Sequence, residues 1–174
     1  IQGQFHNVGV FLERIDPNAG LGGFNLLIAY DQSALSFQKA IEGDIYTQCG
    51  WEYFEYRYGA DGNCGNACPS GLLRVVGIAE TNNGPYHPGC MEPTPYVNGL
   101  PTTLAYLRFL VSSDFTLNCQ FAPVRFFWVD CGDNTLSSAD GSLLFISDKV
   151  FDFANDEPIS NFPSDFPTWG RLLF

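Results

Sequence analysis

The chain has 174 residues, and its 8 lysines and arginines against 19 aspartates and glutamates give a formal net charge of -11. This length fits one domain with a hydrophobic core, because 45% of the residues are hydrophobic and 16% are aromatic. The acidity argues against nucleic acid as a partner, since phosphate binding needs a clustered basic face. No apolar run approaches the roughly 18 residues that predict a membrane span.

Short strands separated by turn sequences fill the chain, and helical periodicity is nearly absent. Apolar residues alternate with more polar neighbours from Val8 to Leu12 and from Phe24 to Tyr30, and a third strand begins at Leu35. The remaining predicted strands are Trp51–Tyr58, Leu72–Ala79, Leu104–Val111, Val124–Val129 and Leu143–Phe153. About eight or nine strands, often apolar on both faces, predict an all-β fold of two sheets packed face to face.

Six cysteines predict disulfide bonds and, with them, an extracellular or cell-surface protein. They are an even number in a lysine-poor chain, which favours an oxidising compartment. The alternative is zinc, because Cys64 and Cys68 have a usable ligand spacing, but only His87 near Cys90 could complete such a site. The predicted disulfide cysteines are Cys49, Cys64, Cys68, Cys90, Cys119 and Cys131. Their pairing stays open among the fifteen arrangements that six cysteines allow.

Two long loops, residues 59–70 and 81–102, interrupt the regular spacing of the strands. Loops of this length are functional or need covalent support, so we interpret the disulfides as staples for them. One pairing is disfavoured by geometry. An extended strand from Phe121 to Asp130 would hold Cys119 and Cys131 about 30 Å apart, so these two are expected to bond elsewhere unless the chain folds back between them.

The segment after Phe153 carries an excess of apolar residues. A solvated disordered tail would not normally hold so much apolar surface, so this segment is expected to pack on something. We therefore divide the chain into a β-sandwich domain, residues 1–153, and an apolar tail, residues 154–174. The predicted assembly residues of the tail are Ile159, Phe162, Phe166, Trp169, Leu172, Leu173 and Phe174.

Three stretches of the chain form a pattern. The first is Gly22-Gly-Phe-Asn-Leu-Leu-Ile-Ala-Tyr-Asp-Gln-Ser-Ala-Leu-Ser-Phe37, followed by Glu42-Gly-Asp44. The second is Leu104–Val111, and the third runs from Phe126 through Asp133-Asn134 to Val150. Together they resemble the cohesin-type domains of secreted prokaryotic proteins, in which the second stretch is similar to a later core strand and the third to the last hairpin. Related carbohydrate-binding sandwiches share part of this pattern. The resemblance implies a jelly roll of about nine strands that is extracellular and non-catalytic. It also implies a protein partner, usually a dockerin module.

Members of that family usually have one more strand before the one expected at Val8 to Leu12. A sandwich without it would leave a row of unpaired N–H and C=O groups along a sheet edge, which invites an added strand. The tail segment Thr168–Phe174 could be that strand. Docked on its own domain it would close a monomer, whereas docked on the next copy it would generate a head-to-tail filament.

The leading hypothesis is therefore a non-catalytic extracellular structural protein that self-assembles into a homopolymer, such as a filament or a surface layer. The alternative is a cohesin-like module that binds another surface protein or a polysaccharide.

Residues suited to catalysis are sparse. The chain has two histidines, His6 and His87, and no Gly-x-Ser-x-Gly nucleophile elbow. The enzymatic alternative is a carboxylate pair, for which the nearest candidates are Glu52, Glu55, Glu80 and Asp130. Glu52 and Glu55 lie in an aromatic strand, where they more simply mark its solvent face. We expect neither an enzyme nor a cofactor.

We also consider two ligand-binding sites, one for a sugar and one for a calcium ion. Aromatic rings can stack on the apolar faces of sugars, although packing over the core is the favoured interpretation here. The possible sugar-binding residues are Trp51, Tyr53, Tyr56 and Tyr58. A calcium ion takes six to eight oxygen ligands, and an acidic cluster near residue 133 could supply some of them, although its sequences are also ordinary turns. The possible calcium ligands are Asp130, Asp133 and Asp140, with Asn134 beside them.

Overall fold

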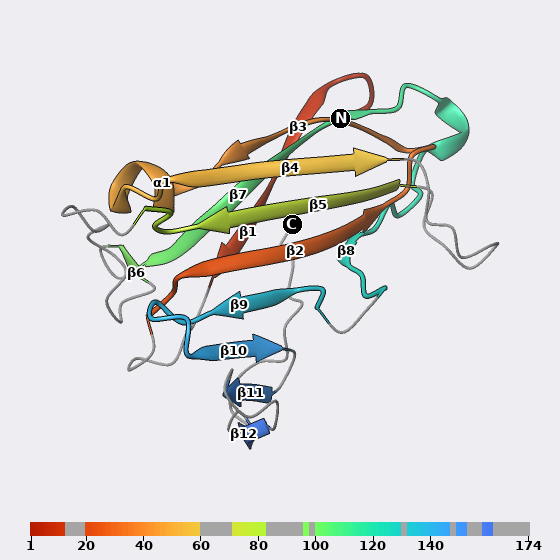
Figure 1. The fold of residues 1–174 in the computed structure, drawn as a ribbon. Coiled ribbons are helices and arrows are strands. Elements are labelled where there is room, and N and C mark those ends of the chain that lie inside the picture. Colours follow the sequence, from red (N-terminus) through yellow and green to blue (C-terminus); the bar gives the residue numbers. More distant parts are fainter. Residues whose placement is uncertain are drawn as a thin grey trace.

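The computed structural model describes the chain outside the segments 13–19, 60–70, 83–95, 98–99, 130–131, 147–148, 153–157 and 162–174. The described part forms twelve strands, one α-helix and one 3₁₀ helix (Figure 1). In chain order these are β1 (Phe5–Leu12), β2 (Gly23–Tyr30), β3 (Leu35–Glu42), α1 (Asp44–Cys49), β4 (Tyr53–Gly59), β5 (Gly71–Ile78), β6 (Tyr96–Val97), β7 (Leu100–Val111), η2 (Phe115–Leu117), β8 (Val124–Phe126), β9 (Thr135–Ser137), β10 (Leu143–Ile146), β11 (Lys149–Asp152) and β12 (Pro158–Asn161).

The smaller sheet has the order β1–β7–β3, and β6 pairs with β7. Its pairings are antiparallel, so that Leu107 at the centre of β7 lies between Val8 of β1 and Ala40 of β3. All three of these side chains are buried. Strand β1 stands at the end of this order, so within the described residues only one of its edges has a neighbouring strand.

The larger sheet has the order β12–β11–β10–β9–β2–β5–β4, and β8 also pairs with β2. Strand β2 lies inside this sheet, and seven of its eight residues are buried. Directly opposed residues of antiparallel strands share a face. The register Ile28–Leu73 between β2 and β5 therefore places both side chains on one face, and both are almost completely buried.

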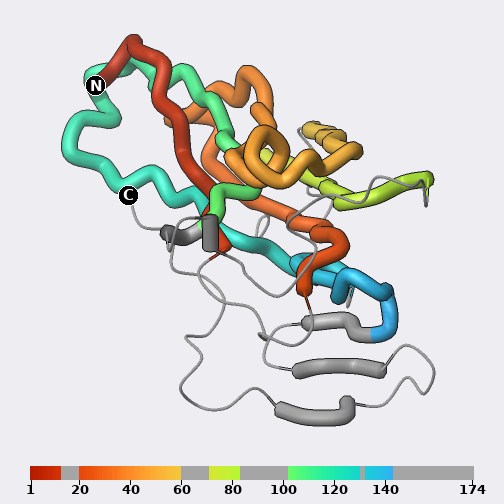
Figure 2. The backbone as a smooth tube through the Cα atoms, turned by 90° about the vertical axis from the view of Figure 1, so that its left-hand side faces the viewer, coloured from red at the N-terminus to blue at the C-terminus, as the bar shows by residue number. Residues whose placement is uncertain are grey.

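The hydrophobic core lies between the two sheets. Strands β1 and β7 lie to one side of β2 and β5 when the molecule is turned by 90° (Figure 2). Both layers contribute to one cluster of buried residues, whose largest members include Phe24, Ile28, Tyr30, Leu73, Leu107, Phe109 and Leu136. Rings from the two layers touch, with the centroids of Tyr30 and Phe109 5.2 Å apart. This arrangement confirms the predicted all-β, two-sheet sandwich.

Several elements differ from the sequence prediction. The segment predicted as one strand from Leu143 to Phe153 is divided into β10 and β11, which pair antiparallel with Phe145 opposite Val150. Strand β8 is only three residues long, and α1 and β9 were not predicted. Helix α1 begins after Gly43, where a Cβ would overlap the backbone of Thr103 and Leu104. Short elements that depend on such contacts leave no periodic signal in the sequence.

Two of the six predicted disulfide cysteines lie within the described residues. Cys49, the last residue of α1, is disulfide-bonded, and its partner lies outside the described residues. Cys119, by contrast, carries a free and exposed thiol, so its predicted disulfide is wrong. The chain before β8 is η2 followed by a turn in which Cys119 has a φ of 61°, rather than the start of an extended strand. The cysteines outside the described residues are Cys64, Cys68, Cys90 and Cys131.

Part of the predicted tail belongs to the larger sheet. Strand β12 includes Ile159 and pairs with β11 of the same chain. The other predicted assembly residues lie outside the described residues: Phe162, Phe166, Trp169, Leu172, Leu173 and Phe174. Among the described residues, no helix is long and apolar enough to cross a membrane.

Candidate functional site

The four aromatic residues predicted as a sugar platform do not lie on one surface. Trp51 is only 5% exposed. Its ring packs in the core against Phe24 and Tyr46, with centroids 5.9 and 5.8 Å away. A ring enclosed in this way cannot stack on a sugar, so the structure corrects the assignment of Trp51.

The other three residues of the predicted platform are divided between the two faces of β4. Tyr56 and Tyr58 face the smaller sheet, where both rings contact Phe37 at centroid distances of 5.8 and 5.0 Å. Tyr53 points to the outer face, because successive side chains of a strand alternate. Its ring is 40% exposed. The alternation of β4 thus separates Tyr53 from the other two rings.

The predicted calcium ligands are engaged with protein groups instead. Asp133 is fully buried and forms an ion pair with Arg74, at 2.5 Å between Oδ1 and Nη2. Asp140 accepts hydrogen bonds from the Ser138 hydroxyl and from the N–H and hydroxyl of Ser142, which lower the pKa of its carboxyl to about 2. Asp130 lies outside the described residues. Within the described part of the chain, no group of three acidic, histidine or cysteine residues could hold a metal ion.

Two of the carboxylates considered for catalysis, Glu52 and Glu55, are exposed and have local hydrogen-bond partners. Glu52 accepts hydrogen bonds of 2.8 Å from both the N–H and the hydroxyl of Thr81. Glu55 accepts one of 3.1 Å from the N–H of Tyr56. Glu80 is half-buried, and His6 is exposed on β1. The other two candidates, His87 and Asp130, lie outside the described residues.

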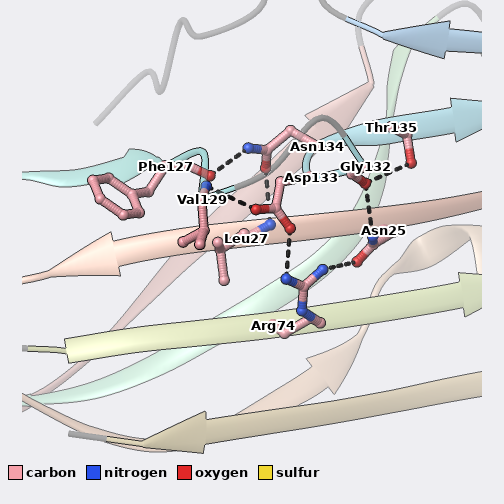
Figure 3. Close-up of polar contacts among 9 residues, drawn as sticks. All are labelled: Asn25, Leu27, Arg74, Phe127, Val129, Gly132, Asp133, Asn134 and Thr135. Carbon is pink, nitrogen blue, oxygen red and sulfur yellow. Dashed lines mark hydrogen bonds and ion pairs between the residues drawn. The ribbon is translucent and has the colours of Figure 1, made fainter. Parts of the chain in front are cut away.

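A polar network around the buried Asp133 fastens the segment between β8 and β9 onto the outer side of the larger sheet (Figure 3). Arg74 of β5 reaches Asp133 and also donates to Asn25 of β2, at 2.8 Å. The other carboxylate oxygen of Asp133 accepts from the N–H of Val129 at 2.9 Å. Asn25 in turn donates to the carbonyl of Gly132 at 3.0 Å. The network joins two strands and one irregular segment through fixed hydrogen bonds.

Asn134 completes this network from within the turn. Its side chain accepts from the N–H of Leu27 at 2.8 Å and donates to the carbonyl of Phe127 at 2.7 Å. The residue has a φ of 56°, a left-handed conformation that asparagine tolerates better than most residues. Leu27 faces outward but is only 5% exposed. The N–H of Phe127 donates to the Leu27 carbonyl at 2.9 Å, so the segment is hydrogen-bonded to both backbone groups of Leu27.

The outer side of β4 and β5 carries several exposed or half-buried side chains, and we call it the outer β4–β5 face. It consists of the outward-facing residues Tyr53, Glu55, Arg57, Leu72, Arg74, Val76 and Ile78. Tyr53 and Ile78 are opposed across the two strands and are 40% and 38% exposed. Glu55 is opposed to Val76, and Arg57 to Arg74. The face thus combines an exposed apolar end with three charged residues, Glu55, Arg57 and Arg74.

Two exposed apolar residues stand at the border of this face. Trp128 and Val129 are 44% and 65% exposed, and they belong to the segment that Asp133 fastens to Arg74. The sequence pattern did not single out these two residues as a site, nor Arg57, Arg74 and Ile78. A signal was present, because the alternation of β5 places Arg74 on the face opposite Leu73 and Val75. The ion pair with Asp133 joins residues 59 positions apart, so no local pattern indicates it.

Comparisons with known proteins identify the fold. No protein-family model and no curated protein matches the chain. Among solved structures, it is similar to a chain of a type I cohesin–dockerin complex of Clostridium thermocellum, Coh-OlpA with Doc918. The sequence identity is 18%, the TM-score is 0.55, and the match covers 80% of each chain.

Two cohesins of Acetivibrio cellulolyticus are also similar. The sixth cohesin of scaffoldin B, solved with a Cel5 dockerin, matches with 19% identity and a TM-score of 0.53 over 80% of each chain. The second type II cohesin of the ScaA scaffoldin matches with 14% identity and a TM-score of 0.50, over 81% of this chain and 80% of that one. At these identities the likeness establishes the architecture. The chain has a cohesin-like fold.

Proposed function

We propose that the chain is a non-catalytic protein-binding module and that it binds its partner through the outer β4–β5 face. The observation that carries this proposal is the composition of that face. Tyr53 and Ile78 are exposed beside the half-buried Val76, and Arg57 lies on the same face. Tyrosine and arginine are enriched among the residues that dominate binding energies, and aromatic and arginine residues are enriched at interfaces.

The preorganised border of the face supports the same proposal. The segment that carries Trp128 and Val129 is held by the buried Asp133, which accepts from the Val129 N–H and pairs with Arg74. A surface that is rigid before binding loses less conformational freedom on association, and its contacts then contribute more to affinity.

The cohesin-like fold supports a protein as the partner, with a dockerin module as the first candidate. Two of the similar structures are described as cohesins in complex with dockerins. The disulfide at Cys49 supports an extracellular or cell-surface location, because disulfides persist in oxidising compartments. A carbohydrate ligand is less favoured, since Trp51 is buried and the tyrosines of β4 lie on opposite faces.

The test measures binding of the full chain to a panel of dockerin modules by calorimetry, with two matched variants. Ile78→Asp places a charge on the outer β4–β5 face, and Phe11→Asp places the same charge on the outer face of β1. Both side chains are partly exposed, at 38% and 51%, so neither variant disturbs the core. We expect Ile78→Asp to weaken binding at least about tenfold, because it places a charge against an apolar contact, and Phe11→Asp to change it little.

Equal weakening by the two variants would contradict the assignment of the face. If no dockerin binds, the proposed partner class is wrong. The face can then be tested with the peptide library described in the next section.

Self-assembly by strand addition is a second candidate function, favoured by one observation. Strand β1 is paired only with β7 among the described residues, so one of its edges could accept a strand. The candidate donor is the apolar segment 168–174. Deleting residues 162–174 spares β12 and should abolish any assembly seen by light scattering and electron microscopy. An unchanged assembly state, or a full-length chain that is monomeric at high concentration, would refute this second function.

A further inference from the structure

Two arginines occupy directly opposed positions at the centre of the outer β4–β5 face. Arg57 of β4 is in register with Arg74 of β5, so both side chains leave the same face of the sheet. The chain has only 8 lysines and arginines and a formal net charge of -11, so a basic pair on one face is not an effect of composition. Like charges directly opposed across a sheet are destabilising unless something compensates them.

Among the described residues, only one arginine of the pair, Arg74, has an ion-pair partner. Arg74 is bound by the buried Asp133 and by Asn25, and its side chain is 37% exposed. Arg57 is exposed and forms no ion pair or hydrogen bond among the described residues. The nearest acidic side chain on its strand face, Glu55, accepts from the N–H of Tyr56. The donors of Arg57 are therefore available, while those of Arg74 are held in a fixed position beside them.

We propose that Arg57, with Arg74 fixed beside it, binds a side-chain carboxylate of the partner protein. This inference rests on the proposed function of the outer β4–β5 face and specifies the chemistry of its partner. A guanidinium presents its donors in a planar fork that matches a carboxylate, and the two hydrogen bonds are strengthened by charge.

The apolar neighbours of the two arginines define the partner further. Val76 and Ile78 continue along β5 from Arg74, and Tyr53 lies opposite Ile78. An acidic residue bound at Arg57 would thus be followed by apolar residues that cover Val76, Ile78 and Tyr53. The partner segment combines an aspartate or glutamate with apolar side chains a few residues away. These apolar side chains would exclude water from the contact, which would strengthen the adjacent ion pair between Arg57 and the partner's carboxylate.

The experiment selects ligands for the full chain from a phage-displayed library of random twelve-residue peptides. Enriched peptides are synthesised and their affinities measured for the wild type, Arg57→Gln and Lys39→Gln. Lys39 is an exposed basic residue on the smaller sheet, so its variant loses the same formal charge at a different place. The Arg57 side chain is exposed and forms no hydrogen bond or ion pair with another described residue, so its variant should fold, which a thermal melt verifies.

We expect the enriched peptides to share an acidic residue next to apolar ones. Their affinity should fall at least about tenfold in Arg57→Gln and stay within about twofold in Lys39→Gln. Replacing the acidic residue of the peptide by its amide should weaken binding to the wild type by a similar factor. The same replacement should have little effect on Arg57→Gln, which identifies the two groups as partners.

The contrary results separate this inference from the function on which it rests. Suppose that the enriched peptides bind the wild type but not Ile78→Asp and share no acidic residue. This result would overturn the carboxylate site and leave the face as a binding surface. Peptides whose binding survives Ile78→Asp, or a library without enrichment, would count against the face itself. Tighter binding of a phosphoserine at the acidic position would identify a phosphopeptide and overturn the assignment to a carboxylate.

Discussion

The two outer faces of the sandwich carry similar residues and use them differently. The smaller sheet exposes Phe5 and Phe11, which are 55% and 51% exposed, and it has its own basic pair, Lys39 opposite Arg108. There Arg108 and the two rings have contacts on the same face. The Arg108 guanidinium lies 4.5 Å from the centre of the Phe5 ring, and the Phe11 ring lies across Gly9.

On the outer β4–β5 face, the partner of Arg74 comes instead from a distant part of the chain. Asp133 is completely buried and pairs with Arg74 from the far side of β2. The contact fixes Arg74 and the segment of Trp128, and it leaves Arg57 without a described partner. Counting exposed aromatic and basic residues therefore does not distinguish the two faces, since each also carries a basic residue, Lys39 or Arg57, without a hydrogen bond or ion pair among the described residues. What distinguishes them is the buried carboxylate that holds Arg74 on the β4–β5 side.

The largest expected effect is a difference in the free energy of unfolding between Arg74→Ala and Arg108→Ala, the variants of the two arginines with described partners. Arg74→Ala leaves the buried Asp133 carboxylate without its counter-charge, and removing one member of a buried pair costs about 3–5 kcal/mol of unfolding free energy. Because Arg74 itself is partly exposed, we expect the lower end of this range. Arg108→Ala removes a surface cation–π contact with Phe5, worth about 0.5–1 kcal/mol.

Urea denaturation of the two variants measures this difference. The double variant Arg74→Ala with Asp133→Ala should be less destabilised than the sum of its single changes, because the residues form one unit. Equal losses for Arg74→Ala and Arg108→Ala would show that Asp133 does not depend on Arg74.

A smaller difference in stability is expected between alanine variants of two glycines, one in a strand of each sheet. A Cβ at Gly77 of β5 would point into the core and overlap the Tyr46 hydroxyl and the Phe24 ring. Overpacking of a core typically costs about 1–3 kcal/mol, so Gly77→Ala should lower the free energy of unfolding by that amount. A Cβ at Gly9 would meet the Phe11 ring at 2.6 Å.

Phe11 is exposed and can turn away, so Gly9→Ala should cost less than about 1 kcal/mol. Thermal or urea unfolding of the two variants checks the order. A larger loss for Gly9→Ala than for Gly77→Ala would mean that the contacts of the outer β1 face are as rigid as the core.

The smallest expected effect concerns the turn between β9 and β10, at the border of the larger sheet. Hydrogen bonds, first from the Ser138 hydroxyl and then from Ser142, lower the pKa of Asp140 to about 2. A carboxyl whose pKa is depressed by folding stabilises the protein above its unfolded pKa of about 3.9, and this contribution is lost as the pH falls toward the folded value.

The urea midpoint of Asp140→Asn should therefore lie below that of the wild type at pH 6, and the difference should shrink between pH 4 and pH 2. Asp114, in the turn after β7, has a pKa lowered by the N–H of Thr116 and should behave in the same direction. If the difference in urea midpoint between Asp140→Asn and the wild type does not change with pH, the carboxylate charge is not what stabilises the turn.

The sheets were predictable from the sequence, because their strands alternate or are continuously apolar. Strands β1, β2 and β5 begin and end within a few residues of their predicted positions. The cohesin-like fold followed from the resemblance around β2. Strand β9 and helix α1 escaped prediction because they are short and depend on contacts between distant segments.

The candidate site was less predictable, for a physical reason. The aromatic strand was recognised, but only the structure shows that Trp51 is in the core and that Tyr53 faces away from Tyr56 and Tyr58. Asp133 was considered as a calcium ligand because its sequence context is acidic. Its actual counter-ion, Arg74, is provided by β5. A side chain's partner across a sheet cannot be deduced from its neighbours along the chain.

The central claim is that the partner binds the outer β4–β5 face. Amide and side-chain chemical shifts of the full chain, measured by NMR with the bound dockerin or selected peptide, test it most directly. We expect the largest changes to fall on Tyr53, Arg57 and Ile78 and to extend to the Trp128 indole, while Phe5 and Phe11 remain unchanged. Changes centred on Phe5 and Phe11 would contradict it.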